Sequence, residues 1–255
     1  MTPYAIEARV AERLDSRPGW SRRWTATWKS AQAEVTCPVR EMAGVPAASM
    51  VPVRRFSWRP DQRHRPGLKF MVSTGRMHGF ESLAERRLLL ALDFAGGVEE
   101  VLAQPFRLRF SSAEGEGEHT PDFLALAPGA GWLVDVRPAD RIKEEDVLRF
   151  AAAGQAAAAA GWRYAVVTGW RGEVMTGIDT LSARRRSMTD RLGLQARLLE
   201  LAGLHPLRFG ELADATAVPA VARAHAVHLL WHRRLAVDLA QPLGDASWIY
   251  PAGRP

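Results

Sequence analysis

The sequence predicts a mixed α/β domain followed by a smaller, mostly helical domain. Strand-like and helix-like segments alternate between residues 80 and 169, whereas the segments between 183 and 232 are helix-like. The chain has 255 residues, of which 47% are hydrophobic, which suits one large domain or two small ones. We therefore divide it into a basic Pro-, Arg- and Trp-rich N-terminal region (1–70), an α/β domain (71–177) and a C-terminal domain (178–255).

Hydrophobic periodicity predicts the elements of the α/β domain in order. Leucines at helical spacing predict a helix over 80–95, and Gly96 and Gly97 follow it as end signals. Alternating Phe and Arg predict a half-buried strand at 106–110. Two strands follow, over 122–127 and 132–137, and Pro-Gly-Ala-Gly joins them. A helix over 143–160 and a buried strand over 163–168 come next. A strand, a helix and a strand in this order predict a right-handed crossover.

The N-terminal region gives weaker signals. A short amphipathic helix is expected within 3–15, and Trp20, Trp24 and Trp28 recur at a helical spacing that is typical of core or interface. The prolines of 45–67 indicate an extended arm or loop.

The C-terminal region predicts three helices followed by a hairpin. This is the element order of a winged helix. The expected helices cover 183–202, 209–215 and 219–232, and the expected strands cover 234–239 and 248–250.

The charge is unevenly distributed along the chain. Residues 1–80 carry 14 basic and 6 acidic side chains, residues 81–180 carry 10 and 16, and residues 181–255 carry 10 and 6. Basic flanks attract phosphates and central acids can hold a divalent metal, as a nucleic-acid enzyme requires. A plain preference for Arg explains the charge equally well, since 31 of the 34 basic residues are Arg.

Several classes of protein are disfavoured. No apolar run approaches the ~20 residues that cross a bilayer, and the first residues lack the apolar stretch of a secretory signal. A single cysteine, Cys37, excludes an intrachain disulfide framework. We expect a soluble, cytoplasmic protein without a membrane association.

The acidic residues of the predicted hairpin form the central candidate site. If the Pro-Gly-Ala-Gly turn is tight, Asp122 lies opposite Arg137 and diagonal to Asp135, ~7 Å away on the same face. Two facing carboxylates require a positive charge, which Arg137 or Mg²⁺ would supply. Glu85 and Glu81 share one face of the preceding helix, and either would complete the set of ligands around the metal ion.

These residues occur within stretches that are similar to a known family. HGFESLAERRLLLALDF, EEVLAQPFRLRF, HTPDFLAL, WLVDVRPADRI and GWRYAVVTG follow one another within residues 78–169. This ordered set resembles the TnsA-like endonucleases of the PD-(D/E)xK superfamily, and residues 190–250 resemble their winged-helix domain. The resemblance implies a restriction-endonuclease-like mixed sheet flanked by helices, plus a C-terminal all-α or winged-helix domain.

The resemblance also implies a catalytic set. The family's metal-binding positions fall on Glu85, Asp122 and Asp135, with Mg²⁺ as the expected ion and Mn²⁺ as its substitute. Arg137 occupies the family's lysine position, where it can clamp a phosphate but cannot act as a base. This departure puts the water-activating role in doubt, and Lys143 is a candidate replacement.

The implied function is that of the endonuclease subunit of a heteromeric Tn7-like transposase. It would cut the non-transferred strand at the 5′ ends of the element by metal-dependent hydrolysis. DNA, a DDE-type transposase and an AAA+ ATPase regulator are the implied partners. Two alternatives stay open: an inactive DNA-binding scaffold with a nuclease fold, and a stand-alone defence nuclease of the restriction type.

Structural interpretations of the same residues also stay open. Asp135 and Arg137 could form a cross-strand ion pair, and Asp122 could be an ordinary turn aspartate. His119 either reaches the site or is solvated. Gln155 resembles a helical polar position that other nucleases of this class use.

Three histidines at helical spacing invite a zinc interpretation, which we reject. Leu229 stands where an HExxH motif needs its glutamate. The histidines are His225, His228 and His232.

Overall fold

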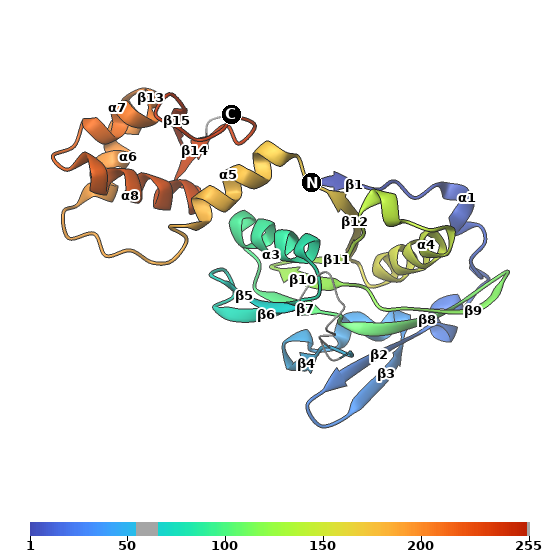
Figure 1. Ribbon diagram of the computed structural model, residues 1–255. Helices are drawn as coiled ribbons and strands as arrows, with labels where there is room; N and C mark the ends of the chain where they lie inside the picture. The colour runs from blue at the N-terminus through green and yellow to red at the C-terminus, as the bar shows by residue number, and fades with distance from the viewer. Residues whose placement is uncertain (55–65, 254–255) are drawn as a thin grey trace. The chain divides into compact units, whose positions relative to one another are not determined.

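The computed structural model describes residues 1–54 and 66–253, and it shows a mixed α/β protein with two compact units (Figure 1). Unit 1 comprises Met1–Leu89 and Gly97–Gly169, and unit 2 comprises Leu90–Gly96 and Trp170–Pro255. Residues 55–65 of the expected arm at 45–67 lie outside the described residues. None of the helices within the described residues is long and apolar enough to cross a membrane.

A five-stranded mixed sheet carries the predicted central elements of unit 1. Helix α4 (Glu144–Ala159) joins β11 to β12, and these two strands are parallel, as the predicted crossover requires. The other pairings in this sheet are antiparallel. The strand order is β1 (Thr2–Pro3), β12 (Arg163–Gly169), β11 (Ala130–Val136), β10 (Phe123–Ala127) and β7 (Glu100–Ala103).

The register of the β10–β11 hairpin differs from the expected one by two residues. Ala127 pairs with Ala130, so the turn consists of only Pro128 and Gly129, and Gly129 adopts a positive φ of 70°. Continuing the pairing places Asp122 next to Asp135 and not opposite Arg137. A shift of two residues preserves the face on which each side chain lies, so both carboxylates still share one face.

A second, antiparallel sheet in unit 1 was mostly absent from our expectations. Its order is β3–β2–β8–β9, and β4 also pairs with β2. The chain passes from β7 to β8 at Gln104-Pro105, where Gln104 has a φ of 46°. The strands are β2 (Thr25–Ser30), β3 (Glu34–Pro38), β4 (Met50–Val51), β8 (Phe106–Ser112) and β9 (Gly115–His119).

Trp20, Trp24 and Trp28 do not share one helix, but the expected core position is confirmed for Trp24 and Trp28. Trp20 begins the short helix α2 (Trp20–Arg23), whereas Trp28 lies within strand β2. Residues four apart share a face in a strand as well as in a helix, so the spacing does not distinguish the two. Both Trp24 and Trp28 are fully buried.

The remaining elements of unit 1 are short, apart from the helix that extends into unit 2. A two-stranded hairpin precedes that helix, and one helical turn replaces the helix expected within 3–15. These elements are α1 (Ala8–Ala11), β5 (Gly67–Met71), β6 (Arg76–Phe80) and α3 (Leu83–Ala95).

The core of unit 1 joins both sheets to helix α4, which lies alongside β11 and β12 in Figure 1. Alanines such as Ala152 and Ala156 let the helix approach closely, and Leu133 packs from the mixed sheet. Trp28 and Phe106 contribute from the second sheet, with their ring centroids 4.8 Å apart. This packing holds the strand ends that carry the candidate site.

The described residues of unit 2 form four complete helices, the end of α3 and a three-stranded antiparallel sheet of order β13–β15–β14. The helix expected over 183–202 begins only at Leu194, because Asp190 accepts the backbone N–H groups of Leu194 and Gln195 and so caps the helix start. The helices are α5 (Gly172–Ser182), α6 (Leu194–Leu204), α7 (Phe209–Asp214) and α8 (Pro219–Trp231). The strands are β13 (Leu207–Arg208), β14 (Leu235–Val237) and β15 (Trp248–Pro251).

Candidate active site

A charged cavity of about 780 Å³ in unit 1 contains all four predicted site residues. Glu85 comes from the first turn of α3, Asp122 from the residue before β10, Asp135 from β11, and Arg137 from just after β11. The further charged or polar residues that line it are Arg54, Glu81, Ser82, Arg87, Glu118, His119, Thr120, Arg141, Asp146 and Arg149. The cavity therefore collects both acids and arginines.

Glu85 is held by the start of helix α3. Its Oε1 accepts a hydrogen bond from the Ser82 hydroxyl at 2.8 Å, and its Oε2 accepts one from the Glu81 backbone N–H at 2.7 Å. The Glu85 N–H in turn donates to Ser82 Oγ at 3.2 Å. Serine followed three residues later by glutamate is the capping-box pattern, so Glu85 also has a structural task.

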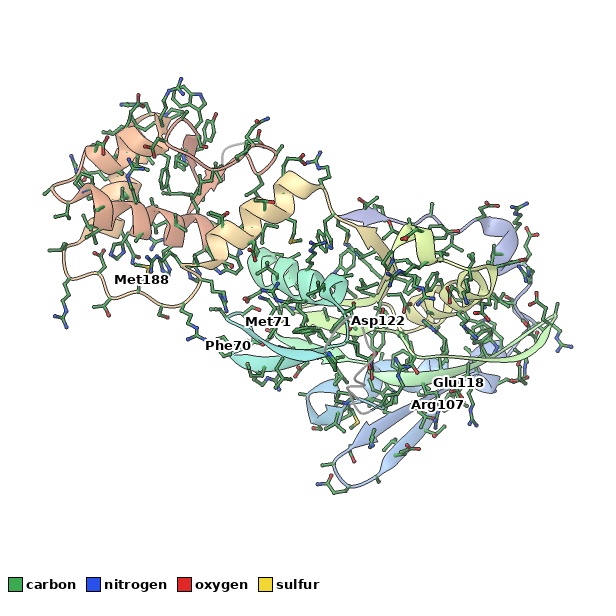
Figure 2. All side chains as sticks on the ribbon, viewed as in Figure 1. Phe70, Met71, Arg107, Glu118, Asp122 and Met188 are labelled. Atoms are coloured by element: carbon green, nitrogen blue, oxygen red, sulfur yellow. The ribbon has the colours of Figure 1, made fainter. Side chains whose placement is uncertain are left out.

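Asp122 is positioned by backbone contacts on both sides. The Gln104 N–H donates to the Asp122 carbonyl at 2.7 Å, and the Val136 N–H donates to its Oδ2 at 2.7 Å. Among the described residues no hydrogen-bond donor reaches Oδ1. Figure 2 shows Asp122 within unit 1, among the strands of the mixed sheet. Asp122 is thus more than an ordinary turn aspartate.

Asp135 is buried, with 2% of its surface exposed, and it is held by two neighbouring strands. His119 Nε2 donates to both of its carboxylate oxygens, at 3.1 and 3.0 Å. The Tyr164 hydroxyl donates to Oδ2 at 2.6 Å. His119 is therefore not a solvated loop residue: it ends strand β9, and its ring contacts Phe150 edge-on.

Arg137 turns toward the start of helix α4. Its Nη2 lies 3.2 Å from Asp146 Oδ2, and its Nε donates to the Arg141 carbonyl at 3.2 Å. Asp146 also accepts the Lys143 backbone N–H at 3.1 Å and thereby caps α4. Gln155 lies elsewhere, since it donates to the Ser16 hydroxyl at 3.2 Å.

Burial and mutual repulsion perturb the acids of this cavity. Burial raises the pKa of Asp122 well above its ordinary value, and the charges of Asp135 and Glu85 raise it further. Burial also raises the pKa of Glu85, against the hydrogen bonds from Glu81 and Ser82. The pKa of Tyr164 is raised well above its usual range by burial and then by the Asp135 carboxylate. Burial and neighbouring carboxylates therefore disfavour the ionised forms of Asp122 and Glu85.

The three carboxylates fit Mg²⁺ in donor type and in charge. Mg²⁺ prefers oxygen ligands, and the carboxylate oxygens of these residues keep a free lone pair, except Asp135 Oδ2, which accepts from both His119 and Tyr164. Within residues 1–54 and 66–253, however, no three His, Cys, Asp or Glu side chains stand close enough together to hold a metal ion. At Asp135 a cation would have to compete with His119 for both oxygens.

Tyr164, which bonds Asp135, was assigned from the sequence only to a buried strand. Arg87 and Arg141, which line the cavity, were not considered. A polar residue within a strand, such as Tyr164 in Arg163–Gly169, was the one available signal for a site contact. The arginines carry no distinguishing local pattern, because the chain is rich in Arg throughout.

Two histidines of α8 and His232, which directly follows this helix, contact other polar groups of unit 2. His228 Nδ1 donates to the Arg184 carbonyl at 2.8 Å, and His232 Nε2 donates to the Arg185 carbonyl at 3.2 Å. His225 Nδ1 lies 3.2 Å from Gln195 Nε2. These contacts connect α8 to the segment between α5 and α6 and to the first turn of α6.

Comparison with known proteins adds no further information about the chain. No protein-family model matches it, and no curated protein matches it in sequence.

Proposed function

We propose that this protein is a Mg²⁺-dependent DNA endonuclease, with Glu85, Asp122 and Asp135 as metal ligands. One observation carries the proposal: carboxylates from three separate elements line one cavity, and neither Glu85 nor Asp122 forms an ion pair with a described residue. Phosphodiester hydrolysis needs such a site, because a divalent ion bound by carboxylates activates water and stabilises charge on the phosphate.

The surrounding residues have defined tasks in this proposal. Tyr164 and His119 hold Asp135 in one orientation, as hydrogen-bonded neighbours of metal ligands commonly do. The Val136 N–H holds Asp122 through Oδ2 and leaves Oδ1 for a ligand. Arg137 would clamp a phosphate by exchanging its ion pair with Asp146 for one with the substrate.

We further propose the TnsA-like assignment that the sequence motifs imply. In this proposal unit 1 is a restriction-endonuclease-like domain, which its mixed sheet and helix crossover support. Unit 2 is a winged helix, which three helices followed by the β14–β15 hairpin support. The protein would cut the non-transferred strand at the 5′ transposon ends, with a DDE-type transposase and an AAA+ ATPase regulator as partners.

A second candidate function is a DNA-binding scaffold whose nuclease site is inactive. It is favoured by the contacts of Asp135, whose two oxygens are both bonded to His119, and by the absence of a tight three-residue metal cluster among the described residues. The arginine at position 137 points the same way. A stand-alone defence nuclease has no such observation in its favour.

Nicking of supercoiled DNA by carboxylate variants tests the endonuclease proposal. Asp122→Asn and Asp135→Asn keep the size of each side chain and remove its charge. We expect each to lose Mg²⁺-dependent nicking by more than the ~10–100-fold that changes in outer-shell partners cost. DNA binding, measured separately by fluorescence anisotropy, should be retained.

Glu118→Gln is the matched control. Glu118 lines the same cavity, but it faces Arg107 and Arg109 at 3.7 and 3.4 Å, and Figure 2 shows it next to Arg107. Its variant should nick at the wild-type rate. Unchanged nicking by Asp122→Asn would overturn the proposal. Titration of Mg²⁺ or Mn²⁺ in a calorimeter separates the two candidates, because the inactive scaffold should bind neither ion.

A further inference from the structure

Two arginines of the cavity form no ion pair with any acid among the described residues. Arg54 lies 3.6 Å from Glu81, and Arg137 and Arg149 both contact Asp146. Arg87 and Arg141 line the same cavity and are exposed, and no carboxylate of residues 1–54 and 66–253 lies within ion-pair distance of either. The cavity thus offers two uncommitted guanidinium groups.

The same cavity contains acids that these arginines do not neutralise. Glu85 and Asp122 accept hydrogen bonds from neutral donors, and neither forms an ion pair with a described residue. Unpaired acids and unpaired arginines thus coexist around one space. A ligand that complements both must present a cation to the acids and an anion to the arginines.

A phosphodiester backbone accompanied by a divalent cation has this combination of charges. Guanidinium groups bind phosphate oxygens in bidentate fashion, and they lose less on desolvation than ammonium groups. Arg87 comes from α3 and Arg141 from the 3₁₀ helix Ala139–Arg141, so the two contacts would come from separate elements. A nucleic-acid strand, with one phosphate per nucleotide, can reach both.

We propose that Arg87 and Arg141 bind backbone phosphates of the nucleic acid at this cavity and position the strand before any metal binds. This inference rests on the proposed function, since it assumes that the cavity receives a phosphodiester. It assigns the strand-holding role to residues outside the predicted set Glu85, Asp122, Asp135 and Arg137. Phosphate contacts of this kind set position and carry no base preference.

The salt dependence of DNA binding tests the proposal. The full chain is titrated into a labelled duplex in EDTA at several KCl concentrations, and the slope of log K against log[KCl] is measured. Arg87→Gln and Arg141→Gln should each reduce the magnitude of this slope by about 0.9, the value of one phosphate contact on duplex DNA, and the double variant by about twice that.

Arg86→Gln is the matched control. Arg86 is the neighbour of Arg87 on α3 and is also exposed, but it does not line the cavity. The slope of log K against log[KCl] for Arg86→Gln should therefore equal that of the wild type. Slopes unchanged in both Arg87→Gln and Arg141→Gln would overturn the proposal, as would a wild-type protein that binds no duplex.

A nicking assay on the wild type separates this inference from the proposed function. If the slopes fall as expected but Mg²⁺ produces no nicking, the phosphate contacts stand and the endonuclease proposal fails. If the wild type nicks DNA and the arginine variants keep the full slope, the endonuclease proposal stands and the phosphate contacts are wrong.

Discussion

At the scale of single residues, Asp122 has the least favourable electrostatic environment that the cavity offers. It shares one face of the mixed sheet with Asp135, and Glu85 adds a third negative charge. Its raised pKa means that the folded protein binds a proton at Asp122 more tightly than the unfolded chain does. Ionised Asp122 therefore opposes folding when no cation is present.

Asp122→Asn should stabilise the protein in metal-free buffer at pH 7. The carboxylate contributes stability below its unfolded pKa of about 3.9, and that stability is lost as the pH rises through the higher folded pKa. Each kcal/mol of relieved repulsion should raise the melting temperature by roughly 2–4 °C. Melting curves of both proteins between pH 4 and 8 measure the difference, which should grow with pH. A variant that melts lower than the wild type at pH 7 would contradict it.

Tyr164→Phe should destabilise unit 1 by removing the hydroxyl that donates to buried Asp135. A hydrogen bond to a charged group contributes about 1.5–3 kcal/mol, and we expect a loss of that size in urea unfolding. Because the pKa of Tyr164 is raised, the wild type loses stability above about pH 10, where the unfolded tyrosine ionises. The difference between the two proteins should therefore shrink above pH 10. If Tyr164→Phe lowers the free energy of unfolding by less than roughly 0.5 kcal/mol, the hydrogen bond to Asp135 does not stabilise the protein as expected.

At the scale of elements, the cavity is surrounded by the beginnings of helices and the ends of strands. Glu85 caps the start of α3 and Asp146 caps the start of α4, so acids at these positions stabilise the helices as well as charge the cavity. Because these acids cap helices, an acid at the start of a helix is not by itself evidence of a metal ligand.

Asp146→Ala should weaken the start of α4. The change removes the acceptor of the Lys143 N–H and the partner of Arg137. Loss of a helix-capping side chain costs about 0.5–2 kcal/mol. Asp146→Asn keeps an oxygen acceptor and should lose less, as chemical denaturation of the three proteins would show. Equal losses in both variants would mean that the ion pair, and not the cap, is responsible.

The β10–β11 hairpin depends on a close approach at Gly131. A Cβ at this position would lie 2.3 Å from the Trp162 ring, which packs on the core of unit 1. Gly131→Ala should therefore cost about 1–3 kcal/mol through overpacking. Gly203→Ala is the control: Gly203 lies in helix α6 with open space around its Cβ position, and this change should stabilise by ~0.5–1 kcal/mol. A neutral Gly131→Ala would show that Trp162 moves freely.

At the scale of the whole molecule, the chain builds two separate hydrophobic cores. One includes Trp28, Phe106 and Leu133, and the other includes Leu198 and Trp231. Units with their own cores commonly unfold as separate cooperative transitions.

Core substitutions should therefore shift different transitions in calorimetry of the full chain. Leu133→Ala and Leu198→Ala each truncate a fully buried side chain, at an expected cost of about 2–5 kcal/mol. The first should lower the unfolding temperature of unit 1 and the second that of unit 2. A single transition that both substitutions shift equally would show that the units unfold together.

Local patterns predicted the elements that have strong periodicity. The helices of Leu83–Ala95 and Glu144–Ala159 and the strands around Asp122 and Asp135 were predicted, because each buries one regular face. Strands such as Glu34–Pro38 and Gly115–His119 were missed because most of their residues are exposed and they depend on pairing with a neighbour. The nuclease function, the DNA and protein partners, and the cytoplasmic location remain predictions.

The sequence predicts which acids are candidates and which of them share a face of the sheet, because side chains alternate between the two faces along the strands of Asp122–Arg137. The groups that hold those acids do not follow from this alternation. Asp135 is bonded by His119 and Tyr164, which come from two other strands, and Arg137 pairs with Asp146 at the start of α4. Hydrogen bonds and ion pairs between distant segments depend on packing and strand register, and these are properties of the folded chain as a whole.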